Sequence, residues 1–285
     1  MLLEQDEVRR RAGEIKLISI DLDGTLLNEA REVTSRSAKA IRGLLERGYL
    51  VVPTTGRSLA LSVHRYPELK GSQYAISTNG ALLTDLSKGE HLYRNTIPLA
   101  EALRLIPALL DDAGSMIYLN TLTTLRTAYR SQADIPIFTE RKPFGVEPDT
   151  ADSLCAWLET SGEEILEIGF HFKREDGYSH YESLAATRHP EVNCFRVGPN
   201  NLEFVAAGAS KASALKELCQ RLGLSPAQIC ALGDNGNDAD TLRFAGLGVA
   251  MANAIQPVRD AANYVTTLSN DEEGAAQFLE DFFLS

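Results

Sequence analysis

The chain has 285 residues, of which 44% are hydrophobic and 24% charged, and its formal net charge is −11. This composition is that of a globular protein with a buried core, and the acidic balance argues against nucleic acid or an anionic membrane surface as the main partner. The four cysteines are widely spaced and form no CxxC pair, which argues against a disulfide framework or a zinc site and favours a reducing, cytoplasmic compartment.

The first third of the chain alternates between short strands and helices. Residues 16–20 (KLISI), 49–52 (YLVV) and 74–77 (YAIS) have the apolar, β-branched character of buried strands. Helices are predicted between them, one starting after Thr34 and one over 58–66. Strands that alternate with helices at this spacing predict a parallel sheet with crossover helices.

The last third repeats this alternation, and the middle does not. After residue 200 the patterns predict helices at 211–222, 237–245, 256–262 and 272–283 and strands at 229–232, 247–250 and 264–266. The middle of the chain carries helical patterns at 99–112, 150–160 and 178–187 and strand-like runs at 115–120 and 165–172. We therefore expect an α/β core formed by residues 1–85 and 201–285, with an α+β domain inserted at 86–200.

Two aspartates directly follow the first predicted strand. Asp21 and Asp23 lie one residue apart in ISIDLDGTLL, before a glycine and a threonine that permit a sharp turn. Ligands of parallel α/β sheets bind outside the carboxyl ends of the strands, so both carboxylates are expected at that edge. A plain strand-ending turn explains this motif equally well when it is taken alone.

Two further loops follow predicted strands and carry polar groups. In VVPTTGRS, Thr55, Gly56 and Arg57 offer a hydroxyl, a backbone N–H and a guanidinium to an anion. In STNGA, Asn79 and Gly80 form a strong turn signal. The four residues Gly56, Arg57, Asn79 and Gly80 are predicted to contact the substrate, although ordinary turns would account for both loops.

The remaining signals lie in the last third of the chain. Lys211 opens a predicted helix, where it can be either a solvated surface lysine or a partner for a phosphate or carboxylate. The segment LGDNGNDAD places Asp234, Asn237 and Asp238 in one loop after a strand. Clustered carboxylates repel one another unless a cation offsets their charge, although a helix N-terminus also attracts acids. The pattern is not an EF-hand, because the closing glutamate is missing.

Together these motifs resemble the haloacid dehalogenase (HAD) superfamily, most closely the Cof-type phosphatases of subclass IIB. DLDGT at 21–25 resembles the first motif of the family, TTGR at 54–57 the second, Lys211 the third and GDNGNDAD at 233–240 the fourth. The resemblance implies a Rossmann-like core, with a parallel sheet flanked by helices, and an inserted α+β cap of type IIB (C2).

The resemblance also implies roles for the residues. Asp21 would be the nucleophile, Asp23 the general acid and base, and Thr55 and Lys211 the groups that stabilise the phosphoryl oxygens. Mg²⁺ would be the cofactor. Its expected ligands and supporting residues are Asp21, the backbone carbonyl of Asp23, Asp234, Asp238 and Asn237.

The function expected from these features is Mg²⁺-dependent hydrolysis of a small phosphorylated metabolite, with a sugar phosphate favoured. The protein would act as a monomer or small homo-oligomer. Two alternatives stay open at this point. One is a phosphomutase or phosphotransferase on the same scaffold, and the other is a non-catalytic metal-binding regulatory module.

Overall fold

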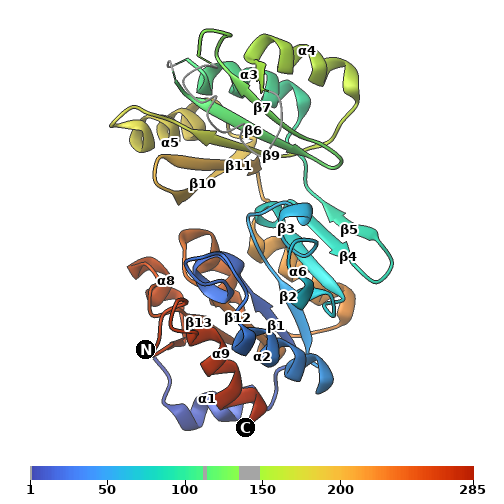
Figure 1. Cartoon of the computed structure of the whole chain (residues 1–285), viewed down its shortest axis with the longest axis vertical. Coiled ribbons are helices and arrows are strands. Elements are labelled where there is room, and N and C mark those ends of the chain that lie inside the picture. Colours follow the sequence, from blue (N-terminus) through green and yellow to red (C-terminus); the bar gives the residue numbers. More distant parts are fainter. Residues whose placement is uncertain (1, 112–113, 135–147) are drawn as a thin grey trace. The chain divides into compact units, whose positions relative to one another are not determined.

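The structure, a computed structural model, describes residues 2–111, 114–134 and 148–285. The chain divides into two compact units (Figure 1). The core unit comprises Met1–Arg94 and Ser210–Ser285, and the inserted unit comprises Asn95–Ala209. Each unit has its own cluster of buried apolar side chains, so each is described by itself.

The core unit is built on a parallel sheet with the strand order β14-β13-β12-β1-β2. Its strands are β1 (Leu17–Ile20), β2 (Leu50–Pro53), β12 (Ile229–Gly233), β13 (Leu247–Ala250) and β14 (Tyr264–Val265). The residues of β1, β12 and β13 are all buried, because a parallel sheet is covered by helices on both faces. The α/β fold expected from the sequence is confirmed.

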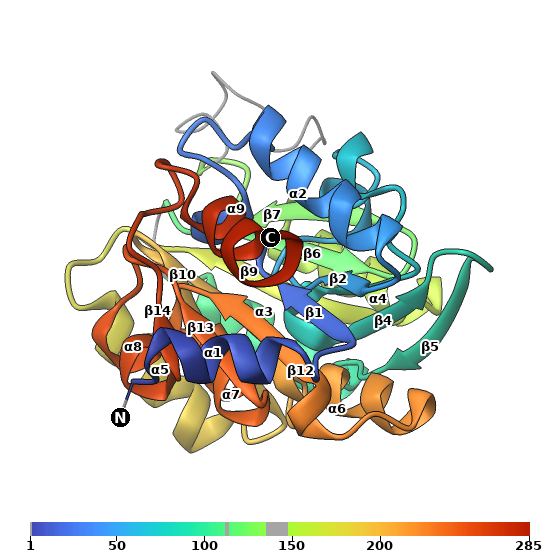
Figure 2. The ribbon, with the colours of Figure 1, turned by 90° about the horizontal axis from the view of Figure 1, so that it is seen from below.

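Helices cover both faces of this sheet. Figure 2 shows α2 and α9 on one side of it and α6 and α7 on the other. Thr34 caps α2 as the sequence predicts, its hydroxyl accepting a hydrogen bond from the backbone N–H of Ser37. The helices of the core unit are α1 (Gln5–Ala12), α2 (Ser35–Glu46), α6 (Lys211–Leu222), α7 (Ala239–Phe244), α8 (Gln256–Ala261) and α9 (Gly274–Leu279).

The helix predicted over 58–66 is wrong. The chain there forms a short 3₁₀ turn at Leu59–Leu61, and a second one follows at Pro67–Leu69. The hydroxyl of Ser62 donates to the carbonyl of Ser58, which offers the backbone an alternative to a continuing helix. Pro67 then forces the preceding residue out of the helical region.

The third predicted strand belongs mainly to a separate antiparallel sheet. This sheet has the order β3-β4-β5, formed by Tyr74–Ser77, Leu82–Asp85 and Glu90–Arg94. It joins β2 through one parallel bridge between Thr54 and Ile76. The expected parallel sheet therefore continues to β3 by a single residue pair.

The inserted unit is an α+β layer pair, as the sequence predicts. Its sheet has the order β10-β11-β9-β6-β7-β8 and is antiparallel except for the β7–β8 pair. The buried apolar cluster of the unit joins its helices to its strands. The strands are β6 (Met116–Thr121), β7 (Leu125–Tyr129), β8 (Pro148–Thr150), β9 (Ile165–His171), β10 (Val192–Gly198) and β11 (Asn201–Ala206), and the helices are α3 (Leu99–Leu109), α4 (Ala151–Ser161) and α5 (Gly177–Arg188).

Both domain boundaries lie later in the chain than the sequence indicates. The predicted boundary after residue 85 cuts β5 away from β4, with which it pairs, and the unit ends at Arg94. The predicted boundary after residue 200 assigns β11 to the core, whereas β11 pairs with β9 and β10 and the inserted unit ends at Ala209. The sequence analysis predicts neither β5 nor β11 as a strand, so the pairing that holds these two segments was missed.

Among the described residues, no helix has both the length and the apolar character that crossing a membrane requires.

Candidate active site

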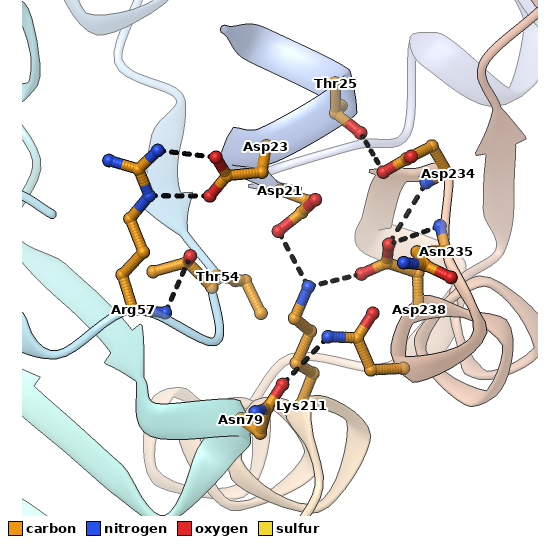
Figure 3. Close-up of polar contacts among 12 residues, drawn as sticks. Asp21, Asp23, Thr25, Thr54, Arg57, Asn79, Lys211, Asp234, Asn235 and Asp238 are labelled. Carbon is orange, nitrogen blue, oxygen red and sulfur yellow. Dashed lines mark hydrogen bonds and ion pairs between the residues drawn. The ribbon is translucent and has the colours of Figure 1, made fainter. Parts of the chain in front are cut away.

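A lysine ammonium lies between two carboxylates at the carboxyl end of the parallel sheet. Asp21 directly follows β1, and Lys211 is the first residue of α6. The Nζ atom of Lys211 donates to Oδ1 of Asp21 and to Oδ1 of Asp238, at 2.7 Å in each case (Figure 3). All three side chains are buried, with relative exposures of 5%, 1% and 2% for Asp21, Lys211 and Asp238. Lys211 is therefore not the solvated surface lysine that remained possible from sequence.

The start of α6 is fixed by its cap. The hydroxyl of Ser210 accepts a hydrogen bond from the backbone N–H of Ser213, and the hydroxyl of Ser213 accepts one from the backbone N–H of Ser210. This reciprocal pair satisfies two N–H groups at the helix start. The cap therefore fixes the backbone position from which the Lys211 side chain extends toward the carboxylates.

The loop after β12 folds around the carboxylate of Asp238. Oδ2 of Asp238 accepts from the backbone N–H groups of Asp234 and Asn235, both at 3.1 Å, while Oδ1 accepts from Lys211. Both oxygens of Asp238 thus have protein donors. The place of Asp238 among the metal ligands, directly or as a support of the metal shell, stays a prediction.

Asp234 approaches the turn after β1 at a glycine. The hydroxyl of Thr25 donates to Oδ1 of Asp234 at 3.3 Å. Gly24 has a φ of +74°, and a Cβ atom there would lie 2.3 Å from Oδ2 of Asp234. Gly24 is needed both for its backbone conformation and for the room that it leaves to this carboxylate.

Burial and mutual repulsion dominate the electrostatics of the site. Burial, together with the negative charge of Asp238, raises the pKa of Asp21 well above its usual range. The same causes raise the pKa of Asp234 to about 7. Burial by itself would lower the pKa of Lys211, but the carboxylates of Asp21 and Asp238 raise it above its usual value.

The carboxylates of the site suit a divalent cation that prefers oxygen ligands. Asp21, Asp234 and Asp238 each offer a carboxylate oxygen, and these atoms lie within 4.8 Å of one another. An all-oxygen donor set is what Mg²⁺ prefers. Burial and the charge of Asp238 raise the pKa values of Asp21 and Asp234, and a bound cation would offset both effects, so the residues fit the expected ion.

The predicted anion-binding loop after β2 instead pairs with Asp23. The guanidinium of Arg57 donates from Nε and Nη2 to the two carboxylate oxygens of Asp23 (Figure 3). The hydroxyl of Thr55, buried to 2% exposure, accepts from the backbone N–H of Arg57 at 3.1 Å. Gly56 lies between them and is partly buried. Contact of Thr55, Gly56 and Arg57 with a substrate stays a prediction.

The loop after β3 connects the other loops of the site. Oδ1 of Asn79, a fully buried residue, accepts from Nδ2 of Asn237 at 2.8 Å, and its backbone N–H donates to the carbonyl of Thr55. Thr78, Asn79 and Gly80 all have positive φ, at 48°, 50° and 87°. Backbone strain of this kind persists only where surrounding contacts impose it. Asn79 is engaged by protein groups, and contact of Asn79 and Gly80 with substrate stays a prediction.

Gly80→Ala should destabilise the protein by more than the cost of its backbone conformation. A Cβ atom at Gly80 would lie 2.0 Å from the carbonyl oxygen of Ser210, at the cap that positions Lys211. Gly48→Ala is the matched control, because Gly48 has a φ of +84° and open space around its Cβ position. We expect a loss of about 1–2 kcal/mol for Gly48→Ala and clearly more for Gly80→Ala, measured by chemical denaturation. Equal losses would contradict this packing role.

Sequence reasoning missed the contacts of two asparagines. Nδ2 of Asn253 donates to the carbonyl of Gly24, and Oδ1 of Asn253 accepts from the backbone N–H of Asn270. Nδ2 of Asn270 donates to the carbonyl of Leu27. These side chains hold the turn that carries Asp23. The signal was present in VAMANA and NDEEGAAQFL, two segments that resemble late features of the family.

Comparison with known proteins places the chain in a family. The family model described as haloacid dehalogenase-like hydrolase matches residues 18–279. Phosphatase YwpJ of Bacillus subtilis is 31% identical over 294 residues, covering 93% of this chain and 99% of the relative. The 5-amino-6-(5-phospho-D-ribitylamino)uracil phosphatase YcsE of the same organism is 29% identical, covering 97% of this chain and 99% of the relative.

Solved structures agree with this assignment. A haloacid dehalogenase-like hydrolase from Bacteroides thetaiotaomicron has a TM-score of 0.78 and 28% identity, covering 94% of this chain and 100% of that one. A structure described as a HAD subclass IIB sugar phosphatase has a TM-score of 0.78 and 22% identity, covering 95% of this chain and 100% of that one, and shows the same fold. The chain belongs to the haloacid dehalogenase-like hydrolases and is a phosphoric monoester hydrolase of that family.

Proposed function

We propose that the protein hydrolyses a small phosphorylated metabolite, a sugar or sugar-alcohol phosphate, through a phosphate ester formed on Asp21, with Mg²⁺ as cofactor. The observation that carries the proposal is the position of Lys211, whose ammonium bridges Asp21 and Asp238 beside Asp234. Relatives described as a phosphatase of a phosphoribitylamino compound and as a sugar phosphatase support the substrate class.

Asp21 would attack phosphorus with a carboxylate oxygen, and the bond to the leaving oxygen would break as the new one forms. Lys211 holds Oδ1 of Asp21, which leaves the other oxygen of that carboxylate to attack. The ammonium also offsets negative charge where an anionic nucleophile meets an anionic phosphate. Thr55, one residue before Gly56 in the loop after β2, would donate its hydroxyl proton to a phosphoryl oxygen.

Asp23 would serve both half-reactions. Its carboxyl group would give a proton to the leaving oxygen and later take one from the water that hydrolyses the ester on Asp21. The Asp23 side chain is half exposed, so it can reach a leaving group that enters from solvent.

Mg²⁺, held by Asp21, the backbone carbonyl of Asp23 and Asp234, with Asp238 in support, would neutralise charge on the phosphoryl oxygens when bound. In this arrangement Gly24 leaves the room that Asp234 needs beside residue 23.

The experiment is a panel of phosphorylated metabolites with Mg²⁺, scored by release of inorganic phosphate, with Asp21→Asn as the blank. Hydrolysis predicts stoichiometric phosphate release from sugar or sugar-alcohol phosphates. Transfer of the phosphoryl group to a second hydroxyl without release would instead favour the phosphomutase alternative. Full activity of Asp21→Asn would reject the proposal.

Mg²⁺ should bind more tightly as the pH rises toward 7 and should then level off. The pKa of Asp234 is raised to about 7, so below that pH the folded protein holds a proton that Mg²⁺ must displace. In the metal-free protein, the raised pKa of Asp234 makes the folded state less stable as the pH rises. The unfolded chain loses this proton near the usual pKa of 3.8, so between about 4 and 7 rising pH favours unfolding.

The measurement is the difference in melting temperature with and without Mg²⁺ at pH 5.5, 6.5 and 7.5. We expect the difference to grow with pH in the natural protein and to be smaller and flatter in Asp234→Asn. A constant difference across these pH values would contradict the assignment of Asp234 to the ion.

A further inference from the structure

The guanidinium of Arg57 binds the carboxylate of Asp23 through two of its nitrogen atoms. Nε donates to Oδ2 of Asp23 at 2.6 Å and Nη2 donates to Oδ1 at 2.5 Å. This bidentate geometry fixes the plane of the carboxylate as well as its position. The Arg57 side chain is 17% exposed and that of Asp23 is 50% exposed, so the arginine is the anchored partner.

The other end of the guanidinium is tied to Tyr66. Nη1 of Arg57 donates to the hydroxyl of Tyr66 at 2.7 Å and to the carbonyl of Leu61 at 3.4 Å. The Tyr66 hydroxyl in turn donates to the carbonyl of Arg31, and the Tyr66 ring lies 5.6 Å from the guanidinium carbon. Tyr66 itself is buried, at 6% exposure, so this contact is part of the packed core.

The backbone of Arg57 is held as firmly as its side chain. Its N–H donates to the hydroxyl of Thr55, and its carbonyl accepts from the backbone N–H of Thr78. A guanidinium has five N–H donors, and the bonds to Asp23, Tyr66 and Leu61 engage all three of its nitrogens. Little donor capacity remains for a substrate phosphate.

Within the described residues, Arg57 is the partner that holds the carboxylate of Asp23. We infer that Arg57 is a positioning residue that acts through Asp23 and not a phosphate-binding residue. The inference rests on the proposed function, in which Asp23 handles the proton of the leaving oxygen. The hydroxyl of Tyr66 accepts a hydrogen bond from the guanidinium and so keeps it in place.

This role has a consequence that phosphate binding would not have. A residue that positions the proton donor matters in proportion to the leaving group's need for a proton. A residue that binds the phosphoryl group matters equally for all phosphate esters. The two roles therefore separate in the dependence of kcat/KM on the acidity of the leaving alcohol.

The test measures kcat/KM for a series of aryl and alkyl phosphates in the natural protein, Arg57→Ala, Asp23→Asn and the double variant. We expect Arg57→Ala to lose about 10²-fold on an alkyl phosphate but only about 3-fold or less on 2,4-dinitrophenyl phosphate. The inhibition constant for inorganic phosphate should stay unchanged. In the Asp23→Asn background the Arg57 change should cost almost nothing further.

Three variants serve as controls. Arg65→Ala removes an exposed arginine from the same segment and should match the natural protein across the series. Tyr66→Phe removes only the bracing hydroxyl and should show a smaller loss with the same preference for poor leaving groups. Arg57→Lys keeps the positive charge but lacks the two parallel N–H donors of the guanidinium. It should therefore restore little of the loss on the alkyl phosphate. If Arg57→Ala fails to fold in a thermal melt, Tyr66→Phe decides the question.

A uniform loss across the series, a weaker inhibition by inorganic phosphate, or additive losses in the double variant would each overturn the inference. Its failure is distinguishable from failure of the proposed function. An inactive Asp21→Asn protein together with a uniform loss in Arg57→Ala would reject only the role of Arg57. An active Asp21→Asn protein would reject the function on which that role rests.

Discussion

Asp21→Asn should lower kcat for phosphate release by at least about four orders of magnitude, while the protein stays folded. Loss of a covalent nucleophile removes the reaction path itself, and losses of about this size or larger accompany such changes in other hydrolases. Stability should be kept or should rise. The change removes a buried carboxylate whose pKa is raised by burial and by Asp238, and Lys211 keeps its contact with Asp238.

Asp240→Asn is the matched control for this change. Asp240 lies in the same acidic segment as Asp238, but its side chain is 74% exposed and pairs with Arg243 on the surface. We expect its kcat to match that of the natural protein. The measurements are phosphate release at saturating substrate and a thermal melt of each variant. Comparable activity in Asp21→Asn and Asp240→Asn would contradict a nucleophilic role for Asp21.

Lys211→Met should cost about 3–5 kcal/mol of unfolding free energy as well as nearly all activity. The side chain is 1% exposed and lies 2.7 Å from a carboxylate oxygen of both Asp21 and Asp238. Methionine fills a similar volume but leaves two buried carboxylates without their cation, which is the costly way to break a buried ion pair.

The control is Lys216→Met in the same helix. Lys216 is exposed, and its ammonium lies 5.5 Å from the ring of Phe244, so its loss should cost no more than about 1 kcal/mol. Urea unfolding at pH 7.5, with and without Mg²⁺, gives both values. Mg²⁺ should recover part of the stability lost in Lys211→Met, because a cation among the carboxylates replaces some of the missing charge. A loss near that of the control would mean that Lys211 is not needed to hold the carboxylates.

Much of the fold could be predicted because its signals are local. β1 and β12 are short apolar runs bounded by turn residues, and α2 begins at a threonine cap. Where these signals were ambiguous, competing local contacts decided. The segment 58–66 has helical composition, but the hydroxyl of Ser62 and the proline at 67 end its helix within one turn.

The domain boundaries depended on two strands, β5 and β11, that the sequence analysis does not predict. β5 is largely exposed and has no apolar alternation that marks it as a strand, yet it pairs with β4. β11 is assigned to the inserted unit by its pairing with β9, whose nearest residue is some thirty positions away in the chain. The exposure of β5 hides its strand character, and local composition does not show that β11 pairs with β9.

For the site, the sequence by itself predicted that Asp21 and Asp234 lie at the sheet edge, whereas it left Lys211 as either a surface lysine or a partner of the carboxylates. Asp21 and Asp234 follow strands directly, and parallel strands present their carboxyl ends at one edge. Only the tertiary structure decided that Arg57 binds Asp23, which lies 34 positions before it. The physical reason is that strand ends are set by local patterns of burial, whereas the partner of a side chain depends on which distant loops the packed sheet brings together.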